Sequence, residues 1–389
     1  MKEGYRLLGD FIRQVDVRNT DGKEENLLGV SVQKMFIPSI ANTVGTDFTK
    51  YKVVKRGQFT YIPDTSRRGD KIGIALLTDY DEGLVSNIYT VFEVKDENEL
   101  LPEYLMLWFS RPEFDRYARF KSHGSVREIM DWDEMCKVEL PVPSIDKQRS
   151  IVKAYQTITE RIELKRRIND NLEATAQAVF QEQFASFYGA DELPDGYRII
   201  NLDNLCTVKG GKRLPADCKL LDTPTDHPYI RVRDVGSNRY VCLTNQFQYI
   251  DEETYSAISR YIVNTGDIVI SIVGTIGLPG KIHSSLDKAN LTENCVKLAN
   301  IHTVTSDYLY YTLCYKKQIK EIDLLTVGAV QAKLPMYNIQ SMKILVPPTK
   351  AIEAFQRKMN VLNEQIEANT VEIQKLYELE EVLLAKLSD

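Results

Sequence analysis

The sequence lacks long hydrophobic runs, paired cysteines and a leader-like N-terminus, and each absence excludes a class of protein. No stretch of the 389 residues approaches 18 consecutive apolar residues, so no membrane-spanning helix is expected. The N-terminal MKEGYRLLGD has no apolar core of the kind found in signal peptides. The six cysteines are scattered and form no C-x-x-C pair. These features predict a cytoplasmic protein with reduced thiols.

Motifs for catalysis are also missing. The stretch nearest to a phosphate-binding loop, GTIGLPGKI (274–282), has the wrong spacing and no Ser or Thr after Lys281. VPPT (346–349) lacks the polar and aromatic residues of the Asn/Asp-Pro-Pro-Tyr/Phe motif of amino-methyltransferases. The four histidines show no metal-ligand spacing. We therefore expect no catalytic, metal or cofactor site in this chain.

One weak catalytic pattern stays open as an alternative. Pro63-Asp64 precedes Glu93-Val94-Lys95, which fits the loose PD…(D/E)-x-K pattern of metal-dependent nucleases. In such a site Asp64 and Glu93 would hold Mg²⁺, and Lys95 would steady the developing charge. Glu93 also lies in an alternating segment, where an outward-facing carboxylate is ordinary.

The chain contains an internal repeat. HGSVREIMDWDEMCKVELPVPS (123–144) aligns with VGAVQAKLPMYNIQSMKILVPP (327–348), and the apolar positions match at a constant offset of 204 residues. Upstream, PEYLMLWFS (102–110) aligns with SDYLYYTLC (306–314) at the same offset. The sequence is therefore a tandem duplication.

Each copy runs into a long periodic segment. In the second copy apolar residues recur at steps of three and four, interrupted only by Asn369 and Glu380. This pattern predicts a helix of about 38 residues with a coiled-coil stripe. The first copy has a similar stripe, with polar Lys165 and Asn169, and is expected to end near Phe187, before the loop YGADELPDGY. The two helices are expected to pack on each other.

The blocks before these helices have the sequence pattern of compact domains that contain both helices and strands. Both contain short alternating runs, such as YTVFEVK (89–95) and DIVISIV (267–273), Gly-rich turns and one late amphipathic helix. We predict an α/β (α+β) protein with two globular domains in tandem, separated and joined by two long antiparallel helices that form a coiled coil with internal pseudo-two-fold symmetry. The expected boundaries are 1–143 and 189–346 for the domains, and 144–188 and 347–389 for the helices.

These features resemble the specificity subunit of type I restriction–modification enzymes. KGGKRLP (209–215) with PYIRVRDV (228–235), and NTGDIVISIVGTIGLPG (264–280) with ANLTENCVKL (289–298), resemble parts of a target-recognition domain. LLGVSVQKMFIPSIANTVGTDFTKYKVVKRGQF (27–59) resembles the other common start of such a domain, and VPSIDKQRSIVKAYQTITERIELKRRINDNL (142–172) resembles the spacer helix. The second helix departs from the family's pattern, because it begins PPTKAIEAF, without the Gln-Arg or Glu-Gln that is usual at this place.

The resemblance implies a function. Two target-recognition domains would each read one half of a split site on double-stranded DNA. The subunit would dock two methyltransferase subunits and, in the full enzyme, two restriction–translocation subunits. The complex would methylate adenine or cut DNA, while this chain would be non-catalytic. S-adenosylmethionine, and ATP with Mg²⁺, would bind to the partner subunits.

Several loops carry side chains suited to DNA. Arg and Lys pair with guanine or phosphate, and Asn and Gln pair with adenine. In the second domain the candidates are Lys209, Lys212 and Arg213 around two glycines, Arg231 and Arg233 on one face of an expected strand, and Thr275 in a tight turn. In the first domain they are Arg67, Arg68 and Lys71. Solvated surface charge is the ordinary alternative for each.

The repeat adds one more pair, Arg127 and Gln331, which occupy equivalent places after Gly-Ser-Val and Gly-Ala-Val. Two domains that read different half-sites need different base-contacting side chains at equivalent positions. Alternatively, both residues could simply cap the segment that follows. The net charge of −6 argues against a stand-alone DNA binder, so weak, salt-sensitive binding is expected. A coiled-coil adaptor whose heads bind only proteins is the alternative function.

Overall fold

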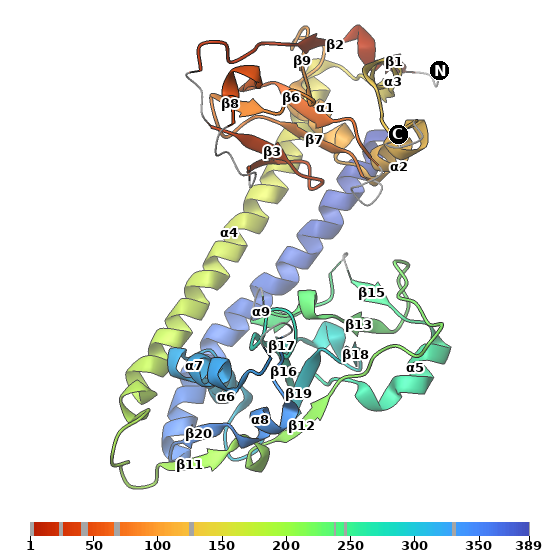
Figure 1. Ribbon diagram of the computed structural model, residues 1–389. Helices are drawn as coiled ribbons and strands as arrows, with labels where there is room; N and C mark the ends of the chain where they lie inside the picture. Colours follow the sequence, from red (N-terminus) through yellow and green to blue (C-terminus); the bar gives the residue numbers. More distant parts are fainter. Residues whose placement is uncertain are drawn as a thin grey trace. The chain divides into compact units, whose positions relative to one another are not determined.

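The computed structural model describes residues 4–22, 26–39, 46–65, 71–123, 128–236, 239–244, 247–328 and 332–388. The chain divides into two compact units, each of which combines one globular domain with part of each long helix (Figure 1). Unit 1 comprises Met1–Leu164 and Lys375–Asp389, and unit 2 comprises Lys165–Gln374. The units divide the chain inside the two long helices, whereas the boundaries expected from the sequence lie at the ends of these helices.

The globular part of unit 1 is built on a four-stranded antiparallel sheet in the order β2-β9-β6-β7. Phe59 and Phe92 pair across this sheet and both pack edge-on against Phe109 of the first helix. Three two-stranded sheets, β1-β10, β3-β4 and β5-β8, complete the domain. The strands are β1 (Tyr5–Leu7), β2 (Ile12–Val15), β3 (Leu28–Val30), β4 (Phe36–Pro38), β5 (Lys52–Lys55), β6 (Phe59–Ile62), β7 (Gly73–Leu76), β8 (Glu82–Val85), β9 (Thr90–Val94) and β10 (Glu139–Pro141). Its helices are α1 (Pro102–Phe109), α2 (Pro112–Lys121) and α3 (Trp132–Cys136).

The globular part of unit 2 has a five-stranded sheet in the order β12-β19-β16-β17-β14. A three-stranded sheet, β15-β13-β18, and the pair β11-β20 accompany it. The strands are β11 (Arg198–Asn201), β12 (Thr207–Gly210), β13 (Pro228–Ile230), β14 (Tyr240–Val241), β15 (Gln248–Tyr249), β16 (Ile268–Ser271), β17 (Pro279–Ile282), β18 (Asn290–Leu291), β19 (Cys295–Ala299) and β20 (Lys343–Val346). The helices are α5 (Glu252–Ile258), α6 (Ser306–Leu313), α7 (Lys316–Leu325) and α8 (Met336–Ser341). The predicted mixed class with two such domains is confirmed.

The internal repeat is visible element by element. The helices α1, α2 and α3 and the strand β10 each begin 204 positions before α6, α7, α8 and β20. Three helices lie late in each block among the described residues, and the one amphipathic helix expected there is the second of them, α2 in unit 1 and α7 in unit 2. The first of them is buried on most sides and carries no clear polar stripe, and the third is very short.

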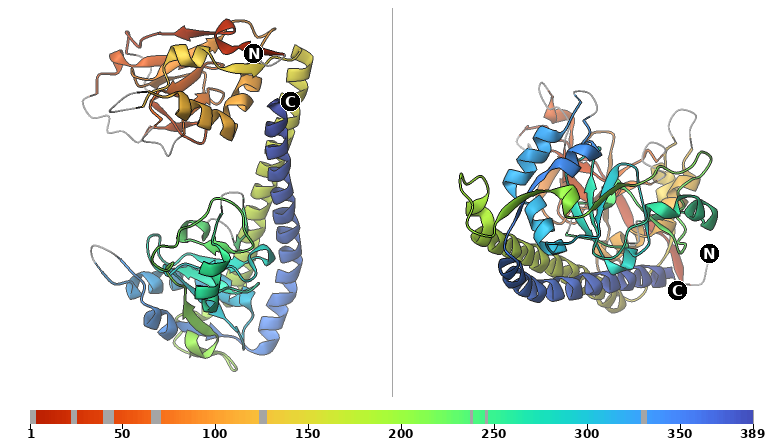
Figure 2. Two further views of the ribbon diagram at one scale, coloured as in Figure 1. Left: turned by 90° about the vertical axis from the view of Figure 1, so that its right-hand side faces the viewer. Right: turned by 90° about the horizontal axis from the view of Figure 1, so that it is seen from below.

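The two long helices are α4 (Ile145–Phe184) and α9 (Thr349–Ala385), of 40 and 37 residues. They contain no Pro or Gly, and each begins directly after the last strand of its domain. Within each unit they lie side by side (Figures 1 and 2). No described helix is long and apolar enough to cross a membrane.

The contacts inside each unit show that the helices run antiparallel. In unit 2, Phe180 packs 6.1 Å from Phe355 between ring centroids, and Lys165 donates a 2.9 Å hydrogen bond to Asn369, which lies later on α9. In unit 1, Tyr155 donates to Glu380 at 2.6 Å. The polar residues that interrupt the two apolar stripes therefore meet polar partners. Lys165 and Asn369 are themselves 204 positions apart, so equivalent positions of the two copies meet at this point.

Buried Gln148 joins the domain of unit 1 to the start of α4. Its side-chain carbonyl accepts the N–H of Leu101 at 2.9 Å, and its amide donates to two backbone carbonyl groups at 2.8 and 2.9 Å. Leu101 precedes α1, which has no side-chain cap. In unit 2 the same position is Ile352, and α6 is capped instead by Thr305. This difference accounts for the missing glutamine at the start of the second long helix.

Candidate nucleic-acid interface

In unit 1 the loop between β6 and β7 pairs with the repeated Gly-containing segment. Asp64 forms an antiparallel bridge with Ile129, which in turn bridges His123 and closes a hairpin. The N–H of Thr65 donates to the carbonyl of Glu128 at 3.1 Å. Thr65, the first residue of TSRRGDK, therefore lies beside this hairpin.

Unit 2 repeats this arrangement. Val273 bridges Lys333, which bridges Val327, and the N–H of Leu334 donates to the carbonyl of Ile272 at 3.0 Å. The hairpin bridges of the two units are related by the 204-residue offset. The structure thus brings together, in each unit, a sheet loop and a hairpin that the sequence had suggested separately.

Four of the predicted DNA-contacting residues, Arg67, Arg68, Arg127 and Gln331, lie outside the described residues. Lys71 is exposed just before β7. Their roles in DNA binding stay predictions.

Thr275 is exposed in the β16–β17 loop of unit 2, where Gly274 and Gly277 have φ of +79° and +80°. A Cβ on Gly277 would lie 2.7 Å from Ile322 on α7. The glycine therefore lets the loop that presents Thr275 pack closely on this helix.

The KGGKR loop is held against the protein's own backbone. The N–H groups of Gly211 and Lys212 donate to the carbonyls of Cys295 and Leu291, at 3.0 and 2.8 Å. A Cβ on Gly211 would lie 2.1 Å from the carbonyl oxygen of Thr292. Gly211 therefore allows the KGGKR loop to pack closely against the segment around β18. The backbone hydrogen bonds fix the position of the loop that carries the cations.

The cations of this loop are exposed. Lys209 points out from β12, and Lys212 lies 5.8 Å from the ring centroid of Tyr261. Arg213 forms a 2.7 Å ion pair with Glu293, although its side chain is 81% exposed. Partial burial acts to raise the pKa of Glu293, but the hydrogen bonds from Arg213, Thr292 and the backbone, with the charge of Arg213, together outweigh it and lower that pKa. Both groups therefore stay charged, and a phosphate would have to compete with Glu293 for Arg213.

The prediction that Arg231 and Arg233 lie on one face of a strand is wrong. Strand β13 ends at Ile230, and a 3-10 turn follows at Val232–Asp234. Asp234 closes this turn by accepting from the backbone N–H and the guanidinium of Arg231, whose Nη1 also donates to Gln248. Arg231 is only 12% exposed and has a structural role here, whereas Arg233 is exposed.

The nuclease pattern does not form a site. The β6–β9 register places Glu93 beside Gln58, which donates to it at 2.8 Å. Asp64 lies six residues farther along, about 20 Å at the rise of a strand. Lys95 is bonded to backbone carbonyls. The described residues contain no group of three potential metal ligands. The hypothesis that Asp64, Glu93 and Lys95 bind one metal ion is therefore wrong.

Sequence reasoning missed one repeated surface feature beside the hairpins. Phe120 at the end of α2 and Leu324 at the end of α7 are 80% and 86% exposed, and they are equivalent in the repeat. One turn earlier, Arg116 and Lys320 are both exposed cations. A search of the repeat for large apolar residues outside the helix stripe would have found this pair.

A buried charge cluster in unit 2 ties the domain to its helices. Asp307 on α6 is 4% exposed and forms ion pairs with Arg239, which is 1% exposed, and with Lys281 at 2.6 Å. Gln356 and Asn363 of α9 donate to it at 2.6 and 2.7 Å. Burial alone would raise the pKa of Asp307, but Lys281 and Arg239 lower it to about 2. The cluster therefore holds an ionised carboxylate.

Helix α4 joins the same cluster through Glu173. Its carboxylate lies 3.7 Å from Arg239 and accepts from Tyr311 at 2.8 Å. Burial raises the pKa of Glu173. In unit 1 the position equivalent to Asp307 is Glu103, which is exposed. The cluster therefore belongs to unit 2 alone among the described residues.

Known proteins are similar to this chain in sequence. A family model for the type I restriction modification DNA specificity domain matches residues 11–174 and 194–382. The HindI specificity subunit of Haemophilus influenzae is 20% identical, covering 98% of this chain and 97% of the relative. The MjaIX specificity subunit of Methanocaldococcus jannaschii is 22% identical, covering 74% of this chain and 68% of the relative.

A solved structure is similar in fold. The crystal structure of the type I restriction-modification system S subunit from M. genitalium covers 99% of this chain and 96% of its own, with a TM-score of 0.52 and 14% identity. Because the family model matches most of the sequence, in two copies, the resemblance is confirmed and the chain belongs to the family of type I restriction–modification DNA specificity proteins.

Proposed function

We propose that each globular domain reads one half of a bipartite site on double-stranded DNA for a type I restriction–modification complex. The observation that carries this proposal is the repeated pairing of a sheet loop with the Gly-containing hairpin in both units. The backbone bridges are equivalent, whereas the residues at the equivalent sequence positions Arg127 and Gln331 differ. Two domains that recognise different half-sites require a similar backbone structure with different base-contacting side chains.

The exposed cations supply the sequence-independent part of binding. Lys71 in unit 1, and Lys209, Lys212 and Arg233 in unit 2, are placed on exposed loops or strand faces, where they can neutralise phosphates. Arg213 can join them by exchanging Glu293 for a phosphate. Phosphate contacts of this kind fix the register, and the base contacts then give specificity.

The partners follow from the same proposal. Two methyltransferase subunits dock on this chain and direct adenine methylation, and two restriction–translocation subunits join them in the complete enzyme. This chain is non-catalytic, and S-adenosylmethionine, ATP and Mg²⁺ bind on the partners. Because the net charge of this chain is −6, it binds DNA weakly by itself, and its partners provide most of the phosphate neutralisation.

A footprint on a pool of random DNA tests this proposal against a purely protein-binding adaptor. The chain is incubated with the methyltransferase subunit, and the protected DNA is sequenced. Two protected half-sites separated by an unread gap support DNA reading, whereas no enrichment of any sequence contradicts it. Arg127→Gln and Gln331→Arg should each alter one half only. Lys55→Gln, which removes an exposed cation of β5 that is not among the candidates, is the control and should alter neither.

A further inference from the structure

One exposed apolar position is shared by the two copies of the repeat. Phe120 and Leu324 are the penultimate residues of α2 and α7, and no large apolar residue in the described part of the chain is more exposed than these two. Three large apolar residues are exposed between the start of α1 and the end of α4, and of these described residues only Phe120 has an exposed apolar counterpart 204 positions later. Single exposed apolar residues are ordinary on protein surfaces, whereas repetition at one position indicates a shared role.

The opposite face of each helix is buried in the same way. Phe114 and Ala118 of α2 are buried, and so are Gln318 and Ile322 at the equivalent positions of α7. The two helices therefore pack on their domains through the same face. Their exposed apolar side chains consequently lie on equivalent faces that are directed towards solvent.

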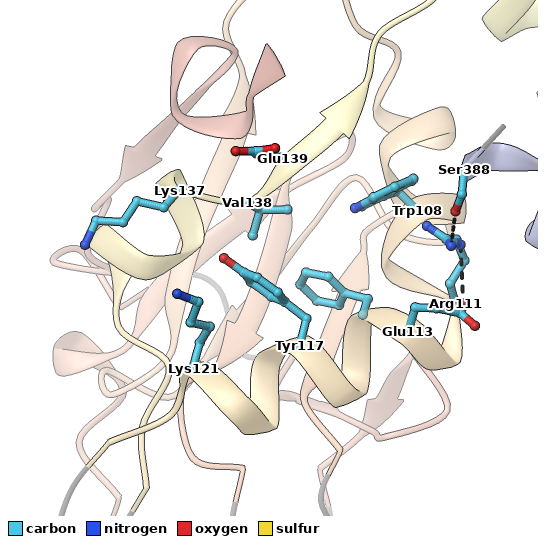
Figure 3. A pocket seen from close by; sticks show the side chains of 10 residues that line it. Trp108, Arg111, Glu113, Tyr117, Lys121, Lys137, Val138, Glu139 and Ser388 are labelled. Atoms are coloured by element: carbon cyan, nitrogen blue, oxygen red, sulfur yellow. Dashed lines mark hydrogen bonds and ion pairs between the residues drawn. The ribbon is translucent and has the colours of Figure 1, made fainter. Parts of the chain in front are cut away.

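A neighbouring face of α2 is already occupied (Figure 3). Tyr117 and Lys121 point from this helix into a cavity of about 510 Å³ beside the α3–β10 turn. The Nζ of Lys121 lies 3.8 Å from Glu134, which also pairs with Lys137 at 2.7 Å. Phe120 is not part of the lining of this cavity. The contacts of the cavity therefore leave the exposed ring of α2 unexplained.

The end of α2 is joined to the sheet loop of the candidate interface. Ser122, which follows α2 and is buried, donates its hydroxyl to the carbonyl of Ala118 at 2.7 Å. The same hydroxyl accepts from the hydroxyl of Thr65 at 2.9 Å, and Thr65 is the residue whose N–H pairs with the hairpin. The ring of Phe120 is thus presented from a helix end that is bonded to the loop proposed to contact DNA.

Unit 2 makes the same junction through different contacts. Thr326, at the position equivalent to Ser122, donates its hydroxyl to the carbonyl of Ile322 at 2.9 Å. Ile322 packs against Gly277 in the β16–β17 loop, where a Cβ would lie 2.7 Å from its side chain. Leu324 is therefore also held next to the sheet loop of its unit.

The apolar residue is what the two helix ends have in common. The residue before it is Arg119 in unit 1, where it is paired with Glu128, but Asp323 in unit 2, which is exposed. The charges therefore identify no shared partner. A contact common to two domains that read different half-sites has to tolerate different sequences. Stacking of an apolar side chain on DNA bases meets this requirement, because every base has an apolar face.

We propose that Phe120 and Leu324 are apolar wedges, each of which inserts at a base step of the duplex beside the half-site that its domain reads. The inference rests on the proposed function, which places DNA on the sheet loop and hairpin of each unit. Phe and Leu are among the side chains that proteins insert between base steps, and such insertion unstacks the step and bends the duplex. The wedges add affinity without specificity and fix where each hairpin lies along the duplex.

The first test measures the unstacking of bases. The complex of the chain with the methyltransferase subunit is bound to its bipartite duplex, with the fluorescent base 2-aminopurine placed in turn along the unread gap and the flanks of both half-sites. The methylated adenines are not replaced, because they leave the stack for the reaction. We expect the fluorescence to rise at one step beside each half-site. Phe120→Ala should remove the rise beside one half-site, and Leu324→Ala the rise beside the other. No rise in the wild type, or a rise that both variants retain, overturns the wedges.

The second test separates an apolar contact from a phosphate contact. The DNA affinity of the same complexes is measured at a series of salt concentrations. Phe120→Ala and Leu324→Ala should each lower the affinity at least about fivefold at every concentration, without a change in the salt dependence. Lys209→Gln, which removes a candidate phosphate contact, should make the salt dependence shallower. A salt dependence that Phe120→Ala makes equally shallow overturns the apolar contact.

Matched variants tie these effects to the two side chains. Phe120→Leu, which copies the other unit, should retain most of the affinity. Ile88→Ala truncates a residue that is 65% exposed between β8 and β9, and it should alter neither the affinity nor the unstacking. Because Phe120 and Leu324 are exposed, their alanine variants should keep the melting temperature of the wild type. A loss of affinity that Ile88→Ala shares would contradict the assignment.

Subunit ratios from native mass spectrometry distinguish DNA from a protein partner. Complexes of Phe120→Ala and Leu324→Ala should contain as many methyltransferase subunits as the wild type. The loss of a subunit would show that these residues bind that protein, and it would overturn the wedges even where the wild type methylates a bipartite motif. If the wild type directs methylation to no bipartite motif, the proposed function itself is contradicted, and the wedges fall with it.

Discussion

Replacing Asp307 by Asn should destabilise unit 2 and leave unit 1 unchanged. The change leaves Arg239, which is 1% exposed, without its nearest counter-charge, and breaking a buried ion pair costs about 3–5 kcal/mol. The pKa of Asp307 gives a second measure of how much this carboxylate stabilises unit 2. Lowering the pKa of Asp307 from 3.8 to about 2 corresponds to about 2 kcal/mol of stability. An asparagine still accepts some of the hydrogen bonds, so we expect a loss of about 2–4 kcal/mol.

The sign of the pH dependence follows from the same shift. Because the folded pKa lies below the unfolded value, this stabilisation is present above pH 3.8 and is lost as the pH falls towards 2. The Asn variant should not show this part of the acid destabilisation. The cluster also contains Glu173, whose pKa is raised by burial, so the comparison is between wild type and variant at each pH.

The assay is urea unfolding followed by hydrogen exchange and mass spectrometry, which reports on the two units separately. The matched control is Glu103→Gln, at the repeat position in unit 1, where the side chain is exposed. This control should change stability by less than about 0.5 kcal/mol. A loss below about 1 kcal/mol in Asp307→Asn, or an equal loss in both units, would show that the cluster does not fix unit 2 to its helices.

Three further predictions address the junction, the loop and the domains. Gln148→Ile, which copies Ile352 of the other unit, leaves three backbone groups unsatisfied and should cost about 3 kcal/mol in thermal unfolding; an unchanged melting temperature would refute the role of this glutamine. Gly211→Ala should displace the KGGKR loop, because its Cβ would lie 2.1 Å from a backbone oxygen, and should weaken methylation at the second half-site. Gly210→Ala is its control, since a Cβ there meets nothing within 4 Å, and equal effects of the two would contradict this reasoning. Exchanging residues 1–143 for another such domain should change one half of the methylated motif, and a change in both halves would refute the two-reader arrangement.

The repeated helices were predictable because they depend on local patterning. The offset of 204 residues between Pro102 and Ser306 persists to the start of the long helices at Ile145 and Thr349. Apolar residues at helical spacing dictate these elements directly. The main-sheet strands keep no such offset, since β6 and β16 begin at Phe59 and at Ile268. Their positions depend on pairing between distant segments, which no local pattern in one sequence reveals.

The candidate interface was predictable only in part, for the same reason. Glycines and cations marked KGGKR and VGTIG as loops, but the bridge between Val273 and Lys333 joins residues 60 positions apart. Arg231 looked like a strand residue because the turn at Asp234 is closed by side-chain hydrogen bonds rather than by a Gly or Pro signal. Tyr188 looked like part of a polar loop, and only its packing on Tyr315 shows it as an anchor.

The most direct test of the central claim is methylome sequencing of cells with and without this chain, in the presence of its methyltransferase partner. Two domains with equivalent backbone bridges, but with Arg127 in one and Gln331 at the equivalent sequence position of the other, should direct methylation to one bipartite adenine motif. We predict that this motif is fully methylated when the chain is present and unmethylated when it is deleted. An unchanged methylome, or a lost motif that is short and continuous, would contradict the account.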